Sequence, residues 1–350
     1  MTNSPGSHRN LADQLPAPIA VTMGEPAGIG GEITLKAWQH LQWESDSAPF
    51  FMLDDPDRLT ILAKRLGIDV PVITITKPAE AALVFRKGLP VLPVKLAAPV
   101  KPGILDPANG AAVVASIDQA VALARSGEAS AIVTNPIHKA ALYACGFAYP
   151  GHTEYLAALA GVEHPVMMLA SPDLRVVPLT IHIPLMDVAR HLTQELVIRT
   201  AETVHAALRD QFGIAEPRLA LSGLNPHAGE NGSIGREEID MLEPAVAILR
   251  ARGMLISGPH SADTLFHAAA RQNYDAALCP THDQALIPIK TLAFDEGVNV
   301  TLGLPFIRTS PDHGTALDIA DKGIARPDSF LAALRLAETL ARKNIRRVAA

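Results

Sequence analysis

Three histidines each lie just beyond an apolar run that is typical of a β-strand: His182 after VVPLTI, His227 after RLALSGLNP and His282 after DAALCPT. In parallel α/β proteins the carboxyl ends of the strands meet at one edge of the sheet, where residues distant in sequence converge. Neutral imidazoles suit a divalent transition metal, and three of them leave one coordination position open for a substrate. We therefore predict a shared catalytic metal site. For any one of the three, capping or backbone hydrogen bonding is the simpler alternative.

The elements that position these histidines alternate between short β-type runs and longer helical patterns, which predicts an α/β protein with a mostly parallel sheet covered by helices. The predicted strands are 18–24, 50–54, 70–75, 130–135, 166–170, 174–181, 218–224, 274–279 and 298–303. The predicted helices are 30–42, 56–66, 109–126, 138–146, 153–160, 194–211, 236–252, 261–271 and 328–343.

Proline and aspartate mark two local features. Asp55 before Pro56 predicts a helix start, because the carboxylate accepts from free amides and proline fits the first helical turn. The stretch 87–108 carries five prolines. It is therefore predicted to be a surface connection or an edge excursion rather than a helix or a central strand.

Length and composition narrow the class of protein. A chain of 350 residues favours two domains, and its 48% hydrophobic residues can bury a large core. A net charge of −6 and only 4% aromatic residues argue against a nucleic-acid partner. The start shows no signal-peptide pattern and no apolar run reaches eighteen residues, so we expect no membrane span, a cytoplasmic protein and a loose tail over 1–17. The two cysteines, Cys145 and Cys279, fit that reducing compartment.

Two further segments suggest ligand binding. MGEPAGIGGE (23–32) follows a predicted strand and opens a helix, where glycines admit close approach of a ligand and the helix start favours an anion. Its spacing is not that of the dinucleotide-binding fingerprint. The segment 281–320 gathers polar residues around glycines, and its Lys290 and Arg308 are suited to a phosphate. Each of these charges, taken alone, is also typical of a solvated surface.

Several motifs together resemble one enzyme family. These are MGEPAGIGGE (23–32), GHTEYLA (151–157), HIPL (182–185), GLNPHAGENG (223–232), GPHSADTLF (258–266), THDQALIPIK (281–290) and GVNVTLGLPFIRTSPDHGTALDIA (297–320). Their order and length resemble the 4-hydroxythreonine-4-phosphate dehydrogenases of pyridoxal phosphate biosynthesis, over residues 18 to 345. The chain departs from the family where Glu25, Gly31 and Ala285 replace the commoner aspartate, proline and glycine.

The resemblance implies an isocitrate/isopropylmalate dehydrogenase-like fold, in which two α/β domains flank an active-site cleft. The first domain is expected to be discontinuous, from 18–135 and 290–350. The second, 136–289, is expected to carry the metal ligands and the dimer interface. The family forms homodimers in which each site is shared across that interface.

The resemblance also assigns roles to residues. His182 and His227 of one subunit, with the partner subunit's His282, are implied to hold a divalent metal such as Zn, Mg or Co. Asp263 and Asp283 are implied to orient those imidazoles or to take part in the chemistry. No cofactor-binding residues are identified. The implied substrate-binding residues are His152, Thr153, Lys290, Asn299 and Arg308.

The implied reaction is NAD- or NADP-dependent oxidation of 4-phosphohydroxy-L-threonine at its C3 hydroxyl. The product, 2-amino-3-oxo-4-(phosphooxy)butanoate, is a β-keto acid that loses carbon dioxide to give 3-amino-2-oxopropyl phosphate. One alternative within the fold is oxidation of 4-phospho-D-threonate or D-erythronate in sugar-acid catabolism. Another is oxidation of aromatic cis-dihydrodiols, but Lys290 and Arg308, which suit a phosphate, argue against it. A third is a metal- or phosphosugar-binding protein without catalysis.

Overall fold

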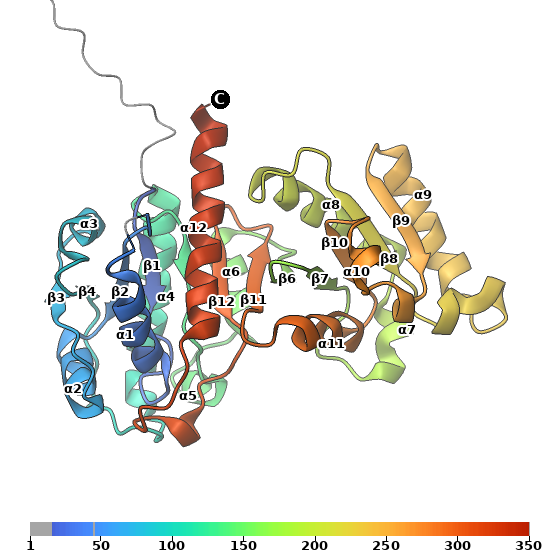
Figure 1. Cartoon of the computed structure of the whole chain (residues 1–350). Coiled ribbons are helices and arrows are strands. Elements are labelled where there is room, and N and C mark those ends of the chain that lie inside the picture. The colour runs from blue at the N-terminus through green and yellow to red at the C-terminus, as the bar shows by residue number, and fades with distance from the viewer. Residues whose placement is uncertain (1–15, 45, 350) are drawn as a thin grey trace, which may run out of the picture.

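A single twelve-stranded sheet runs through the molecule (Figure 1). The computed structural model describes residues 16–44 and 46–349. Most of the predicted tail, 1–17, lies outside the described residues. The strand order is β3-β4-β2-β1-β5-β12-β11-β6-β7-β10-β8-β9. No helix in the described part of the chain is long and apolar enough to cross a membrane.

The strands are β1 (Ile19–Thr22), β2 (Phe50–Asp54), β3 (Val72–Thr74), β4 (Leu89–Pro93), β5 (Ile132–Val133), β6 (Val166–Ala170), β7 (Arg175–Pro178), β8 (Arg218–Ser222), β9 (Leu255–His260), β10 (Ala276–Cys279), β11 (Val298–Leu302) and β12 (Arg308–Pro311). The α-helices are α1 (Gly30–Leu41), α2 (Pro56–Leu66), α3 (Ala81–Val84), α4 (Gly110–Ser126), α5 (Lys139–Ala144), α6 (His152–Ala160), α7 (Val188–His191), α8 (Gln194–Asp210), α9 (Glu243–Ala251), α10 (Ala268–Arg271), α11 (His282–Ala293) and α12 (Asp328–Ala349). A π-helical turn, Glu238–Leu242, leads into α9.

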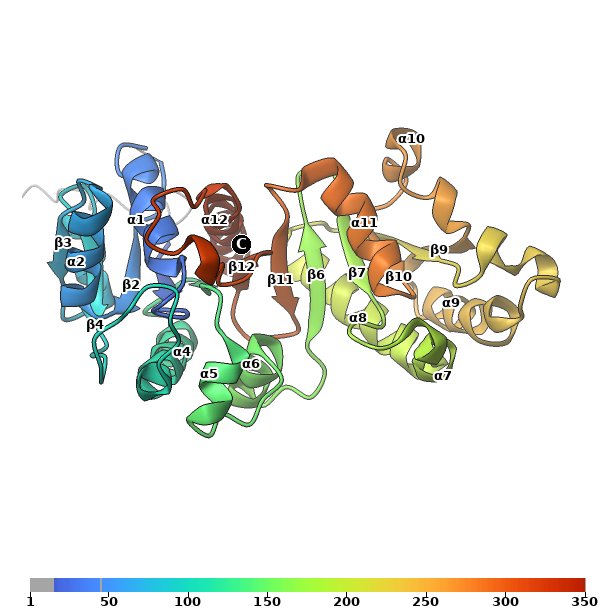
Figure 2. The same ribbon diagram turned by 90° about the horizontal axis from the view of Figure 1, so that it is seen from below.

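The sheet consists of two parallel blocks joined by an antiparallel seam. The first block consists of the mutually parallel strands β3, β4, β2, β1, β5 and β12, and the second consists of the mutually parallel strands β7, β10, β8 and β9. Between the blocks, β11 is antiparallel to β12 and to β6, and β6 is antiparallel to β7. Three antiparallel pairings reverse the direction an odd number of times, so the two blocks run in opposite directions. Figures 1 and 2 show β11, β12 and β6 in the middle of the molecule.

Hydrophobic side chains cover both faces of the sheet. On one face, the alternate residues Val298, Val300 and Leu302 of β11 join a core built with α1, α12, α8 and α9. On the other face, α4, α5 and α6 pack over the first block, while α11 packs over the second. The other residues of β11, Asn299 and Thr301, point to the opposite face of the seam, which lies between α6 and α11. An opening is therefore expected there.

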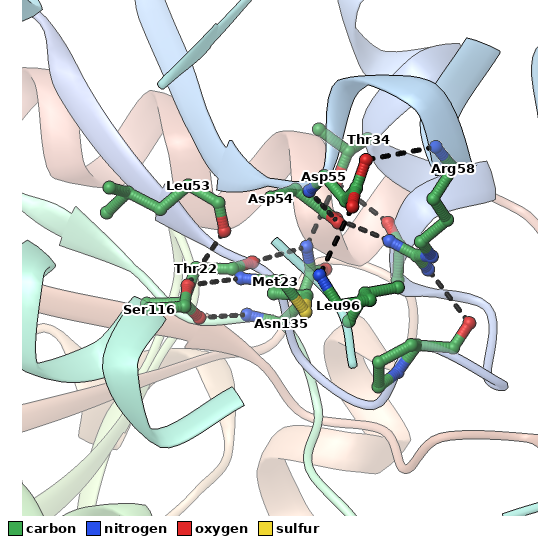
Figure 3. A network of polar contacts seen from close by, with 12 residues as sticks. Thr22, Met23, Thr34, Leu53, Asp54, Asp55, Arg58, Leu96, Ser116 and Asn135 are labelled. Atoms are coloured by element: carbon green, nitrogen blue, oxygen red, sulfur yellow. Dashed lines mark hydrogen bonds and ion pairs between the residues drawn. The ribbon is translucent and has the colours of Figure 1, made fainter. Parts of the chain in front are cut away.

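A buried polar network fixes the end of the first block (Figure 3). Asn135 donates through its Nδ2 atom to the Thr22 carbonyl and to Thr34 Oγ1, both at 3.0 Å. Gly24 lies so close that a Cβ there would be 2.6 Å from the Cβ of Asn135, which is why this position requires glycine. Arg58 pairs with the buried Asp54 and donates to the Pro26 carbonyl at 2.9 Å. The Asn135 bonds hold the residues that flank segment 23–32 against the segment after β5, and the Arg58 bonds hold the same segment against α2.

The sequence predicted most elements, and the predicted α/β class is confirmed. The helix at Pro56 begins as expected, with Asp55 accepting from the backbone N–H groups of Asp57 and Arg58. The prediction for 87–108 was wrong in part, because β4 pairs with both β3 and β2. Pro93, the last residue of β4, pairs with Asp54 of β2. On the side of β3 that strand has already ended opposite Val91, so the N–H group that Pro93 lacks removes no hydrogen bond to β3.

Other segments also differ from the prediction. Strands β9 and β12 and helix α11 were not predicted, and the predicted helix 261–271 is a 3₁₀ turn followed by the short α10. The boundaries placed near 135 and 290 stay a prediction.

Candidate functional site

A pocket of about 540 Å³ opens over the seam of the sheet. Its floor follows from the strand register. Asn299 pairs with Ser310 of β12 and with Leu169 of β6, and Val298 and Val300 face the opposite core. The side chains of Asn299 and Ser310 therefore point into the pocket. The lining is completed by residues after β5 (134–137 and Lys139), the start of α6 (150–154), Met167, Ile181, His182, Arg308 and the segment 311–314.

Arg308 is a buried cation in the wall of this pocket. Only 3% of it is exposed, and burial lowers the pKa of its guanidinium to about 10. The guanidinium donates to Thr301 Oγ1 at 2.9 Å and to Thr134 Oγ1 at 2.6 Å. Neither acceptor is charged, and no carboxylate in the described part of the chain is ion-paired with it. Glu154, also in the pocket wall, offsets part of the effect of burial on the pKa of Arg308 without contacting it as an ion pair. A buried cation that has no ion-paired carboxylate fits a site for an anion.

Unpartnered polar atoms concentrate at the same place. The atoms Asn135 Oδ1, His152 Nε2, Asn299 Oδ1, Arg308 Nε and His313 Nε2 are buried and lack a hydrogen-bond partner among the described residues. All five residues line this pocket. Buried polar groups are normally satisfied, so a cluster of exceptions indicates a polar ligand with both donors and acceptors.

His152 and Thr153 open helix α6 at the edge of the pocket. Gly151, the residue before the helix, provides no side-chain cap, so the first N–H groups of α6 are free for a ligand. Burial, together with the nearby Arg308 guanidinium, holds the pKa of His152 well below its usual value. His152 is therefore neutral at physiological pH and offers a hydrogen bond rather than a charge.

Lys290 reaches the rim of the pocket from α11. Its Nζ atom lies 2.8 Å from Asp312 Oδ2, and Asp312 is among the lining residues. Lys290 is 40% exposed along its side chain, so this ion pair is accessible to solvent. The structure thus places four of the five predicted substrate residues in the pocket wall and the fifth beside it.

The three histidines follow neighbouring parallel strands, as predicted. His182 comes after β7, His227 after β8 and His282 after β10, and these strands are adjacent in the sheet. The imidazole rings of His182 and His282 lie 5.9 Å apart between centroids. Within residues 16–44 and 46–349, however, no group of three His, Cys, Asp or Glu side chains of one chain is placed to hold a metal ion. His282 is also the first residue of α11, a helix that the sequence did not predict.

Carboxylates contact two of these rings. His282 Nδ1 is 2.8 Å from Asp283 Oδ1, and His227 Nδ1 is 2.6 Å from Glu230 Oε1. Asp263 lies close enough to His227 for each to affect the other's pKa. In both hydrogen-bonded rings the Nε2 atom remains available as a ligand, which is the arrangement that a carboxylate imposes on metal-binding histidines.

The sequence did not single out four polar residues that shape the site. Thr134 and Thr301 hold Arg308, Asn135 lines the pocket, and Glu230 contacts His227. Thr134 and Asn135 end a predicted strand, and polar residues at a strand end were the available signal. Thr301 lies inside a strand, where only the register reveals which face it takes.

Comparisons with known proteins converge on one family. The family described as "Pyridoxal phosphate biosynthetic protein PdxA" matches residues 47–337. The chain is 60% identical to a 4-hydroxythreonine-4-phosphate dehydrogenase of Methylorubrum extorquens (strain PA1) over 333 residues, covering 93% of this chain and 95% of that protein. A crystal structure of 4-hydroxythreonine-4-phosphate dehydrogenase from Klebsiella pneumoniae has a TM-score of 0.85 and 39% identity, covering 93% of this chain and 99% of that one. A terephthalate 1,2-cis-dihydrodiol dehydrogenase from Burkholderia xenovorans has a TM-score of 0.64 and 29% identity, covering 93% and 98%.

Proposed function

The chain belongs to the PdxA family, the 4-hydroxythreonine-4-phosphate dehydrogenases of pyridoxal phosphate biosynthesis, and on that basis we propose that the pocket over the seam is its active site. The substrate, 4-phosphohydroxy-L-threonine, is oxidised at C3 with NAD or NADP as the hydride acceptor. Oxidation of 4-phospho-D-threonate, the alternative within the fold, is not favoured by these relatives.

The observation that carries this proposal is the buried Arg308 in a pocket of unpartnered polar atoms. A phosphorylated amino acid supplies what the pocket lacks, namely two anionic groups and a hydroxyl. Asn299, His152 and Thr153 bind its polar groups beside Arg308, and Lys290 adds a positive charge at the rim. Together they fix C3 in one orientation, which converts binding energy into rate.

We further propose that His182, His227 and His282 bind a divalent metal ion. The donor set fits, because two of the rings have their Nδ1 atoms at carboxylates and their Nε2 atoms free. Asp283 and Glu230 orient these rings, and Asp263 adds negative charge near His227. When bound, the metal acts as a Lewis acid that lowers the pKa of the substrate hydroxyl. Zn, Co and Mg are the candidates that we consider.

The assembly we propose is a cytoplasmic homodimer. In one chain the rings of His182 and His282 lie 5.9 Å apart, and the described residues group no three ligands. In line with the family resemblance, each metal set in this proposal combines His182 and His227 of one subunit with His282 of the partner subunit. The neutral His152 and the Arg308 guanidinium then hold the substrate in one subunit while the metal ligands come from both.

The test compares the two phosphorylated substrates. Reduction of NAD and NADP is followed by absorbance with 4-phosphohydroxy-L-threonine and with 4-phospho-D-threonate, each with and without a chelator. We expect turnover of the first substrate that the chelator abolishes. His227→Ala is expected to lose the metal and the activity, whereas His40→Ala on α1 serves as the control and keeps both. Faster turnover of 4-phospho-D-threonate would refute the substrate assignment, and full metal content in His227→Ala would refute the metal site.

A further inference from the structure

The segment that carries His227 has an unusual backbone. His227, Ala228, Gly229, Glu230 and Asn231 have φ values of 51°, 51°, 78°, 42° and 56°, a run of five left-handed residues. Residues other than glycine adopt this conformation at a cost, and then mostly singly. Such strain persists only where the surroundings enforce it. The turn brings Glu230 to the Nδ1 atom of His227, so its shape determines how the imidazole is presented.

A single buried carboxylate lies against this segment. Glu238, 1% exposed, accepts through Oε1 from the backbone N–H groups of Leu224 and Asn225, both at 2.8 Å. Its Oε2 atom accepts from Asn225 Nδ2 at 2.9 Å. No lysine or arginine in the described part of the chain is ion-paired with Glu238, so these three donors balance its charge.

Glycines allow Glu238 to reach both ends of the turn. A Cβ at Gly223 would lie 3.2 Å from Glu238 Oε1, and a Cβ at Gly229 would lie 2.7 Å from Oε2. The carboxylate therefore fills the space between the start of the segment and the middle of the left-handed turn. Asn225 is held in addition by Glu237, whose Oε2 atom accepts from the same amide at 2.7 Å.

The same segment is tied to the second histidine. Gln284 closes the capping box of α11 with Thr281, and its Nε2 atom donates to the Gly223 carbonyl at 2.8 Å. His282 lies between Thr281 and Gln284 on that first turn. One hydrogen-bonded chain thus runs from Glu238 through the start of the His227 segment to the helix start that carries His282.

We propose that Glu238 is a positioning residue for metal binding, which holds the left-handed turn and thereby the ring of His227. This inference rests on the proposed role of His227 as a metal ligand. Glu238→Gln keeps the size of the side chain but turns one acceptor into a donor. That donor would face Asn225 Nδ2, unless the Asn225 amide flips and loses its bond to Glu237.

The experiment uses the full-length protein and Co²⁺ as the probe. We expect Glu238→Gln to bind Co²⁺ about 10- to 100-fold more weakly, as is typical for groups that support metal ligands, with an altered visible spectrum of the Co²⁺ complex. Hydrogen exchange in the metal-free protein should rise at 223–234 and stay unchanged elsewhere. The control is Glu32→Gln in α1, which removes another buried carboxylate (1% exposed), one that is ion-paired with Lys36. It should leave Co²⁺ affinity at the wild-type value.

Two further variants and a control for the second protect the test against a failure of Glu238→Gln to fold. Glu237→Gln weakens the same support from a partly exposed position and should give a smaller loss of Co²⁺ affinity. Gly229→Ala should lose affinity, whereas Gly127→Ala, with a similar φ of 80° but no atom within 4 Å of the added Cβ, should not. Wild-type Co²⁺ affinity and spectrum in a folded Glu238→Gln would overturn the inference. If His227→Ala also binds Co²⁺ normally, the proposed metal site itself fails; if only His227→Ala is impaired, the positioning role alone fails.

Discussion

Replacing Arg308 by methionine should separate ligand binding from stability. In the ligand-free protein the guanidinium is buried without an ion-paired carboxylate, and burial lowers its pKa from the ordinary value to about 10. A difference of that size corresponds to about 3 kcal/mol of penalty on the charged form at neutral pH. Methionine removes this penalty and loses two hydrogen bonds from a charged donor to hydroxyls, worth about 1.5 to 3 kcal/mol each. The net expectation is a free energy of unfolding that is unchanged or lower by up to about 3 kcal/mol.

Catalysis should respond more strongly than stability. If Arg308 donates two charge-assisted hydrogen bonds to an anionic group of the substrate, their loss costs about 3 to 6 kcal/mol. That corresponds to a fall of about 10²- to 10⁴-fold in kcat/KM, expressed mainly as a higher KM. Inorganic phosphate should raise the thermal midpoint of the wild type and leave that of Arg308→Met unchanged.

Thermal unfolding with and without phosphate, together with steady-state kinetics, measures both effects. Arg175→Met is the control, because Arg175 is also partly buried, over the ring of Phe212, and lies away from the pocket. That variant should lose stability and keep its KM. A loss of clearly more than about 3 kcal/mol in ligand-free Arg308→Met, with little change in KM, would show that the guanidinium is structural and refute the anion site.

Three further outcomes can be measured. Because burial keeps the pKa of His152 below its ordinary 6.5, the unfolded chain gains a proton on acidification that the folded chain does not. The free energy of unfolding should therefore decrease as the pH is lowered from 6.5. In denaturant titrations between pH 5 and 7, His152→Gln should show a weaker dependence of that free energy on pH. Asp54→Asn should destabilise the protein by about 3 to 5 kcal/mol, because it leaves the buried Arg58 unpaired, and adding Arg58→Met should recover part of the loss in the same titrations. Mixing inactive His182→Ala with inactive His282→Ala should restore about a quarter of the activity if each site is shared between subunits, since half of the dimers then carry one intact site; no recovery would place both ligands in one chain.

Local sequence patterns predicted the bounds of helices and strands correctly where the packing of the fold agreed with those patterns. The strand 50–54 and the helix 56–66 have the predicted bounds, because Phe50 to Asp54 are uniformly apolar up to the last residue and Asp55 with Pro56 is a strong helix start. Helix α11 escaped prediction because Pro288 and the polar residues of 281–290 are typical of a loop. The capping box between Thr281 and Gln284, and packing of Ala285 and Ile289 against the core, override that pattern.

The pattern of strand ends predicted that the three histidines converge, but it did not predict that Asn299 and Arg308 share one face of the sheet, and the reason lies in the topology. Strands β7, β10 and β8 are parallel neighbours, so the convergence of strand ends applied to His182, His227 and His282. Arg308 and Asn299 lie within β12 and β11, and sequence alone gave neither the β12 strand nor its antiparallel pairing with β11. Their common orientation depends on register, which single-strand patterns do not encode.

The seam also explains how one site draws on two sets of strand ends. The two parallel blocks run in opposite directions, so the carboxyl ends of β5 and β12 and those of β7, β10 and β8 lie at opposite edges of the sheet. Residues from both edges can meet only across a face of the strands between them, and the polar face of β11 and β12 provides that surface. Paired strands then fix the position of Arg308 relative to the end of β7, and the short segment 179–181 carries the chain from there to His182. Substitutions that shift the pairing of β11 with β6 should therefore disturb anion binding and metal binding together, whereas changes in the loops at either edge should affect one of them.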